Sequence, residues 1–245
     1  MHLAMTMATT RRIVMQLLND KRTLAIVLVV PVVVLTLLHY LFDGREPLVS
    51  RVELIMLVVF PIILMFLLTS IAMVRERISG TLERLLTTPI AKSNILFGYA
   101  LAFGFLAAIQ VTVATVFTSW VLDMQVQGPM WLVLVTGIVG AQLGVAFGLL
   151  ASAISMSEFQ AVQLFPALII PQLLLCGLFG PREEMASVLN AISNALPVTY
   201  AVEALTELLD HPEATSHFWI SLGIVAACVI ALLMIAAATL RRRTA

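Results

Sequence analysis

The chain has 245 residues, of which 61% are hydrophobic and 11% charged, and its mean hydropathy is +1.05. Soluble domains carry about 25% charged residues, so this composition excludes a water-soluble globule and indicates that lipid covers much of the surface. The formal net charge is zero, which provides no bulk field for binding nucleic acid. The two cysteines lie in apolar runs, so we expect them to be packing residues without a disulfide.

Six apolar stretches are long enough to cross a membrane, because a bilayer core of about 30 Å needs about 20 apolar residues in a helix. They cover residues 23–41, 54–74, 95–122, 131–154, 159–179 and 218–240. The first stretch is too long for the apolar part of a signal peptide, and no small-residue cleavage site follows it. We therefore expect an all-α integral membrane protein with six transmembrane helices in a single domain over residues 1–245.

The positions of Lys and Arg predict how the spans are oriented. With the N-terminus in the cytoplasm, 11 of the 14 basic residues lie on the inner side and three on the outer side. Trp120, Trp131 and Trp219 then all lie at the outer interface. The zero net charge divides into +7 inside and −7 outside, and a basic inner face suits anionic lipid. Both termini are thus expected to be cytoplasmic, in a multi-pass protein of the cytoplasmic (inner) cell membrane.

Residues 1–22 are expected to lie on the inner membrane surface. An apolar face with helical spacing includes Leu17, whereas Arg11, Arg12 and Asp20 face elsewhere. This pattern is typical of a short amphipathic interface helix.

The loop over residues 75–94, between the second and third spans, contains another amphipathic segment. Its apolar side chains share one helical face: Ile78, Leu82, Leu85 and Leu86. Gly80 permits a break before most of this stripe, and Pro89 discourages a helix from continuing beyond it. The stripe needs a surface that buries it, which could be the chain's own helix ends, the lipid surface or a cytoplasmic partner.

On the outer side, residues 181–217 are too long for a simple connector and too apolar for a solvated loop. A helical stripe runs from Met185 to Leu196, Pro197 interrupts it, and a second helical pattern follows over residues 199–209. Two short re-entrant helices that are covered by protein would explain this segment.

The fourth span carries three glycines at intervals of four residues: Gly140, Gly144 and Gly148. A face of small residues allows close approach of another helix. We expect that helix to belong to the same chain.

Residues for catalysis or for ion coupling are missing from the sequence. It contains no Gly-x-x-x-x-Gly-Lys-Ser/Thr phosphate loop, and its four His residues are scattered without a metal-binding motif. The deep parts of the predicted spans hold no Lys, Arg, Asp or Glu, which argues against a proton- or ion-coupled carrier. We expect no enzyme and no bound metal, and any use of ATP has to come from a partner.

The order of residues around the second loop resembles a known family. Residues 76–89 read Glu-Arg-Ile-Ser-Gly-Thr-Leu-Glu-Arg-Leu-Leu-Thr-Thr-Pro, and Leu-Phe-Gly at 96–98 and Gln110 follow. A second match is Leu-Phe-Gly-Pro at 178–181 with Leu-Pro-Val-Thr-Tyr-Ala-Val-Glu-Ala-Leu at 196–205. Both patterns are similar to those of type-2 permeases of ATP-binding-cassette (ABC) exporters, which include drug, antibiotic and polysaccharide exporters. One departure is Tyr99, where many members carry Lys.

The resemblance implies a single permease domain over residues 1–245 whose second loop is a coupling helix seated in a groove of a separate ATPase subunit. Its candidate coupling residues are Glu76, Ile78, Gly80, Leu82, Glu83, Arg84, Leu85 and Leu86. The leucines would bury apolar area in the ATPase, and the charged residues would pair with its charges. Two ATPase copies would bind ATP and Mg²⁺, this chain would bind no cofactor, and a second identical or different permease would complete the assembly.

The resemblance also implies a substrate pathway between two permeases. Gln163, Phe165 and Gln172 are candidates to line it, because the fifth span mixes amides, an aromatic residue and two prolines. Candidate residues of the outer re-entrant segment are Pro197, Tyr200 and Glu203. With only 7% aromatic residues, a drug, antibiotic or lipid-like substrate is favoured over a polysaccharide or glycolipid. A secondary carrier and a non-transporting membrane assembly factor stay open as less favoured functions.

Overall fold

The computed structural model describes residues 2–42, 44–45, 48–81, 92–180 and 182–239, and these residues form helices joined by short segments. The elements in chain order are α1 (His2–Asn19), α2 (Lys21–Leu41), α3 (Leu48–Ile78), α5 (Lys92–Trp120), α6 (Met130–Ile154), α7 (Glu158–Leu168), α8 (Ile170–Leu175), the 3-10 helix η1 (Arg182–Glu184), α9 (Ser187–Ser193), α10 (Pro197–Asp210) and α11 (Ser216–Thr239). The predicted all-helical fold is confirmed.

The six predicted spans each correspond to a helical segment long and apolar enough to cross a membrane. These segments are Lys21–Leu41, Leu48–Ile78, Asn94–Trp120, Met130–Ile154, Glu158–Leu175 and Ser216–Thr239. The second is longer than predicted at both ends, since α3 begins at Leu48 and continues past its apolar centre through the charged residues at 75–77. Long helices of this composition make the chain a multi-pass membrane protein.

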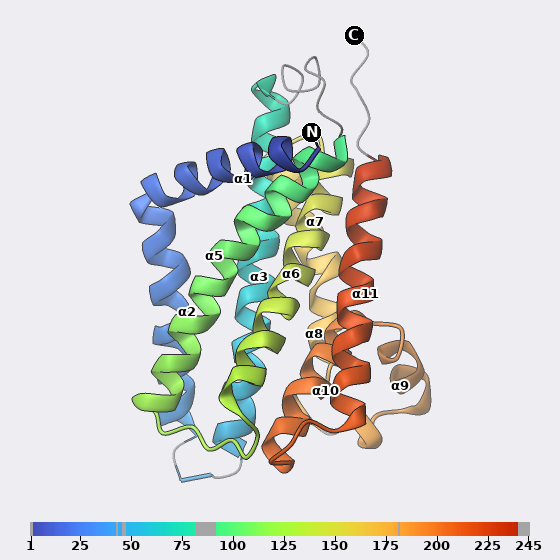
Figure 1. Cartoon of the computed structure of the whole chain (residues 1–245). Coiled ribbons are helices and arrows are strands. Elements are labelled where there is room, and N and C mark those ends of the chain that lie inside the picture. The colour runs from blue at the N-terminus through green and yellow to red at the C-terminus, as the bar shows by residue number, and fades with distance from the viewer. Residues whose placement is uncertain (1, 43, 46–47, 82–91, 181, 240–245) are drawn as a thin grey trace.

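The spanning helices stand side by side, and α1 lies across one end of them (Figure 1). The last turn of α11 is at this same end, whereas α9 and α10 lie at the opposite end (Figure 1). Trp120 ends α5, and Trp131 and Trp219 lie in the first turns of α6 and α11. All three residues are therefore at the end away from α1, and each is more than half exposed. The three tryptophans thus gather at one end of the bundle, as the sequence predicted.

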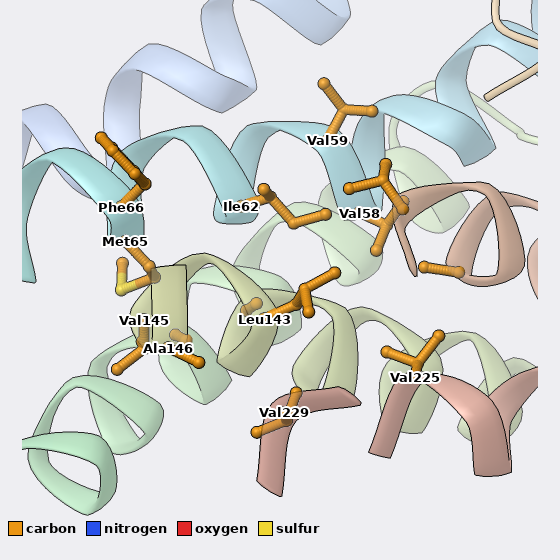
Figure 2. Packing of buried hydrophobic residues seen from close by; sticks show 14 of the residues in the cluster. Val58, Val59, Ile62, Met65, Phe66, Leu143, Val145, Ala146, Val225 and Val229 are labelled. Carbon is orange, nitrogen blue, oxygen red and sulfur yellow. The ribbon is translucent and has the colours of Figure 1, made fainter. Parts of the chain in front are cut away.

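The centre of the bundle is the contact between α3 and α6, which Figure 2 shows with Ile62 and Leu143 between the two helices. The glycine face of α6 makes this contact possible. A methyl group at Gly144 would overlap the carbonyl oxygen of Ile62, and one at Gly148 would lie 2.6 Å from the carbonyl oxygen of Phe66. The predicted close packing within the chain is confirmed.

The fifth span differs from the continuous helix predicted over residues 159–179. It is divided into α7 and α8 at Ile169, and α8 ends at Leu175. Pro166 lies in α7 and Pro171 in the first turn of α8, and a proline removes a backbone donor and crowds the preceding turn. Beyond α8, Gly177 has a φ of +91°, a conformation that glycine adopts without strain.

The segment predicted to be re-entrant forms η1, α9 and α10. The apolar face of α10 is fully buried, with Ala204, Leu205 and Leu208 at 0% exposure, and it packs against α11, α6 and α3. By contrast, Val188 and Ile192 of α9 are exposed within this single chain. Protein therefore covers α10, whereas the apolar face of α9 is left open.

Candidate functional site

At the end of the bundle where α1 lies, an ion pair joins α1 to the last turn of α3. Arg12 Nη2 is 3.1 Å from Glu76 Oε1, and the Glu76 side chain is only 13% exposed. The two residues are far apart in the sequence, so the contact exists only because α1 folds back over the helix ends. Glu76 thus has a partner within its own chain, whereas the sequence suggested a partner on the ATPase.

The first turns of α5 complete this contact. Tyr99 is 2% exposed, and its side chain lies close to the charges of Arg12 and Glu76. Directly before it, Gly98 permits close approach of α1, since a methyl group there would lie 2.8 Å from Thr9 Cγ2. The Thr10 hydroxyl also reaches the Gly98 carbonyl oxygen at 3.3 Å. Tyr99, the departure from the family pattern, is therefore part of the polar contact between α1, α3 and α5.

Two further arginines attach the end of α3 to its other neighbours. Arg77 donates to the carbonyl oxygens of Ser152, at the end of α6, and of Ser155, the latter at 3.2 Å. Arg75 makes a bidentate pair with Glu158, the first residue of α7, at 3.0 and 3.1 Å. Bidentate guanidinium–carboxylate pairs fix orientation as well as distance. The end of α3 is held by α1, α6 and α7 through charged side chains.

Immediately after this contact the chain leaves the α3 helix. Gly80 has a φ of +71°, so it supplies the left-handed conformation that ends a helix, as its position in the sequence suggested. Ile78, the first residue of the predicted apolar stripe, is 60% exposed. The other candidate coupling residues, Leu82, Glu83, Arg84, Leu85 and Leu86, lie outside the described residues.

The interface helix predicted over residues 1–22 is α1, and it is followed at once by α2. Leu17 packs against the core, Arg12 is partly buried in its ion pair and Arg11 is exposed. Asp20 caps α2 by accepting hydrogen bonds from the Thr23 hydroxyl at 2.6 Å and from the Thr23 amide at 3.1 Å. These bonds hold the pKa of Asp20 below its ordinary value. The cap fixes the corner between α1 and α2.

The three candidate pathway residues lie in different surroundings. Gln163 is exposed on α7, Phe165 packs on Phe66 with ring centroids 5.7 Å apart, and Gln172 is 3% exposed. The Gln172 amide donates to the Leu168 carbonyl oxygen at 2.7 Å and accepts from the Val198 amide at 3.4 Å. The structure does not bring the three together in this chain, and Gln172 links α8 to the start of α10.

At the opposite end, the candidate residues of the outer segment lie on α10. Pro197 occupies its first turn, and the Tyr200 hydroxyl donates to the Asn194 carbonyl oxygen at 2.7 Å. Glu203 pairs with Arg182, a residue that the sequence did not single out. A lone arginine in a loop gives no signal of a partner on a later helix. Within the described part of the chain, no group of three His, Cys, Asp or Glu side chains could hold a metal ion.

The comparison with protein families decides which kind of membrane protein this is. The family model of the ABC-2 type transporter matches residues 5–209, which include most of α1, the end of α3 that the arginines hold, and most of α10. The chain belongs to the ABC-2 type transporter family. These residues form the transmembrane permease domain of such a transporter, and the sequence resemblance is confirmed.

Individual relatives agree with this assignment. ABC transporter G family member 20 of Dictyostelium discoideum is 27% identical over 178 residues, which are 72% of this chain and 24% of that protein. The probable multidrug ABC transporter permeases YbhS and YbhR of Escherichia coli are 27% and 26% identical over 58% and 64% of this chain. The chain spans only 38% and 42% of the length of these two permeases.

Proposed function

We propose that this permease is the membrane subunit of an ATP-driven exporter, working with two copies of a separate ATPase and with a second permease. The two Escherichia coli relatives are described as probable multidrug ABC transporter permeases, which supports an export role. ATP and Mg²⁺ would bind on the ATPase, since the sequence of this chain has no phosphate loop.

The observation that carries this proposal is the polar contact around the end of α3. Arg12, Arg75 and Arg77 connect that end to α1, α7 and α6. Residues 82–91, with the leucines of the predicted coupling stripe, follow directly. A push on those residues by an ATPase would reach three other helices through short, charge-assisted bonds, and such contiguous contacts can transmit a conformational change.

This role requires the end with α1 to face the cytoplasm. The bias of 11 basic residues to three supports that orientation. The tryptophans then lie at the outer interface, and α9 and α10 lie in the outer leaflet. The cytoplasmic membrane is the location that this arrangement favours.

The proposed substrate is hydrophobic or amphipathic, such as a drug, an antibiotic or a lipid-like molecule. Apolar helices without deep charged residues suit such a molecule better than an ion, because an ion would need polar groups to replace its hydration. The descriptions of the two Escherichia coli relatives are in keeping with this class.

Substituting the apolar stripe tests the proposal. Leu82→Asp or Leu86→Asp would force a charge into an apolar groove, and it should remove the ATPase that co-purifies with the wild-type permease, while membrane insertion is retained. Val188→Asp is the matched control, because it places the same charge at an exposed position on α9, at the other end of the molecule. An unchanged yield of ATPase with the Leu82 and Leu86 variants would disprove the assignment of the stripe.

A further inference from the structure

A cavity of about 870 Å³ lies at the end of the molecule away from α1, and the function proposed above does not use it. Residues of α3, η1, α9 and α10 and of the segment between α5 and α6 line it. Its volume falls in the range of about 300–1,000 Å³ that is usual for small-molecule sites. Charged, amide and apolar side chains share its walls, so an amphipathic ligand fits its chemistry better than a purely apolar one.

Backbone contacts hold the walls of this cavity in place. The Gln125 amide donates to the Ser50 hydroxyl at 3.3 Å, which ties the segment after α5 to α3. The Gly128 amide donates to the Leu208 carbonyl oxygen at 2.8 Å, which ties the same segment to α10. A site that is formed before its ligand arrives loses less entropy when it binds.

One of the two arginines in the cavity has all its partners within the chain. Arg182 pairs with Glu203 and donates to Ser193 Oγ at 3.0 Å, to Asn190 Oδ1 at 3.2 Å and to Asn194 Oδ1. This pair is electrically neutral and its guanidinium donors are used. Arg182 and Glu203 therefore build the wall and leave little charge for a ligand.

Arg51 and Asp210 differ from this neutral pair. Within the described part of the chain, Arg51 donates to the Gly177 carbonyl oxygen at 3.4 Å, and no carboxylate lies within ion-pair distance of it. Asp210 is exposed at the end of α10, and in the same described ranges it has neither a hydrogen bond nor an ion pair from its side chain. The cavity thus presents one positive and one negative group on different elements, each open to a ligand.

We propose that this cavity binds a zwitterionic, phosphate-containing amine, with the phosphate against Arg51 and the ammonium against Asp210. Guanidinium groups bind phosphate oxygens through charge-assisted hydrogen bonds, and a carboxylate is the matching acceptor for an ammonium group. The apolar side chains of Val126, Val202 and Leu209 on the same walls would contact the carbon atoms of the ligand. Asp210 would repel a simple anion and Arg51 would repel a simple cation, so a ligand with a single charge is disfavoured.

Ethanolamine phosphate chemistry occurs both in free headgroups and in lipids, and the test separates these sources. The full-length permease, purified without ATPase in a phosphate-free detergent, is titrated with phosphoethanolamine, with dihexanoylphosphatidylethanolamine and with dihexanoylphosphatidylglycerol, and heat of binding is measured. The first two share the zwitterion, whereas the third has a phosphate but no ammonium. Since no ATPase is present, the result is independent of the exporter assignment.

We expect saturable binding of at least one zwitterionic probe, and weaker binding of phosphatidylglycerol. Arg51→Gln and Asp210→Asn should each lower the affinity for the zwitterionic probe by about tenfold, which is the usual effect of losing one charged hydrogen bond. Arg45→Gln is the control, because this exposed arginine near the start of α3 does not line the cavity. Binding of phosphoethanolamine alone identifies a soluble ligand class, and binding of the lipid only identifies a membrane source; either supports the site.

Equal affinity of the wild type and both variants for the zwitterion would overturn the proposal. Equal binding of phosphatidylglycerol and phosphatidylethanolamine, unchanged by Asp210→Asn, would do so as well. Helicity and gel-filtration profiles show whether each variant is folded. If Arg51→Gln is unfolded, Asp210→Asn alone decides the test, because Asp210 is exposed at a helix end and its replacement should leave the protein folded.

Discussion

Glu76 lies in the last turn of α3, with a side chain that is mostly buried, so its charge requires a partner close by. Arg12 supplies that partner, and the buried Tyr99 lies beside the pair. Because the pair is neither fully exposed nor fully buried, breaking it should cost about 1–2 kcal/mol of stability, between the usual values for the two extremes.

A double-mutant cycle measures this interaction. Arg12→Gln and Glu76→Gln should each lower the midpoint of thermal unfolding in detergent. In the double variant, the midpoint should fall by less than the sum of the two single decreases. The exchanged pair, Arg12→Glu with Glu76→Arg, should recover part of the loss. Strict additivity of the two single substitutions would show that the side chains do not interact in solution.

Asp20 gives a second prediction at the scale of a residue. Its pKa is lowered in the folded state, so the cap stabilises the start of α2 above the ordinary pKa of an aspartate and this contribution is lost as the pH falls through the lowered value. Asp20→Ala should therefore speed hydrogen exchange of the Thr23 amide at neutral pH. Asp20→Asn keeps an acceptor oxygen, so the Thr23 amide should exchange more slowly in this variant than in the alanine variant. Equal exchange rates in all three proteins would contradict the capping role.

Among the elements, α3 and α6 have the closest contact, and glycine makes it possible. Gly144→Ala should destabilise the permease by about 1–3 kcal/mol, because its methyl group would meet the backbone of Ile62 and not a flexible side chain. Gly223→Ala on α11 is the matched control, since its methyl group would enter open space and alanine favours the helix. Chemical unfolding of both variants is the measurement, and similar midpoints would refute the packing explanation.

Sequence patterns predicted some contacts between elements and missed others. Three glycines at four-residue spacing mark a helix face by themselves, so the packing of α6 could be predicted without its partner. Arg12, Arg75 and Arg182 each bind a carboxylate on a distant element, and no local pattern marks such a pair. The break at Ile169 does not follow from Pro166 and Pro171 alone, because prolines are tolerated within membrane helices when neighbours replace the lost bonds.

For the whole molecule, the proposed division of labour between permease and ATPase predicts how transport is energised. In proteoliposomes that contain the complete complex, export of an amphipathic dye should require ATP and persist when a proton ionophore removes the pH gradient. The reason is that the sequence places no Lys, Arg, Asp or Glu in the deep parts of the predicted spans, where such groups would couple proton movement. Dye movement that needs the gradient and ignores ATP would instead indicate a secondary carrier.

The gathering of Trp120, Trp131 and Trp219 at one end has a practical consequence for spectroscopy. Each indole is more than half exposed, and all the tryptophan fluorescence of the protein comes from this one end of the bundle. Brominated lipids confined to one leaflet should quench nearly all of that emission or almost none of it. The chain therefore carries its own one-sided optical label, which reports the direction of insertion in each vesicle preparation without chemical modification.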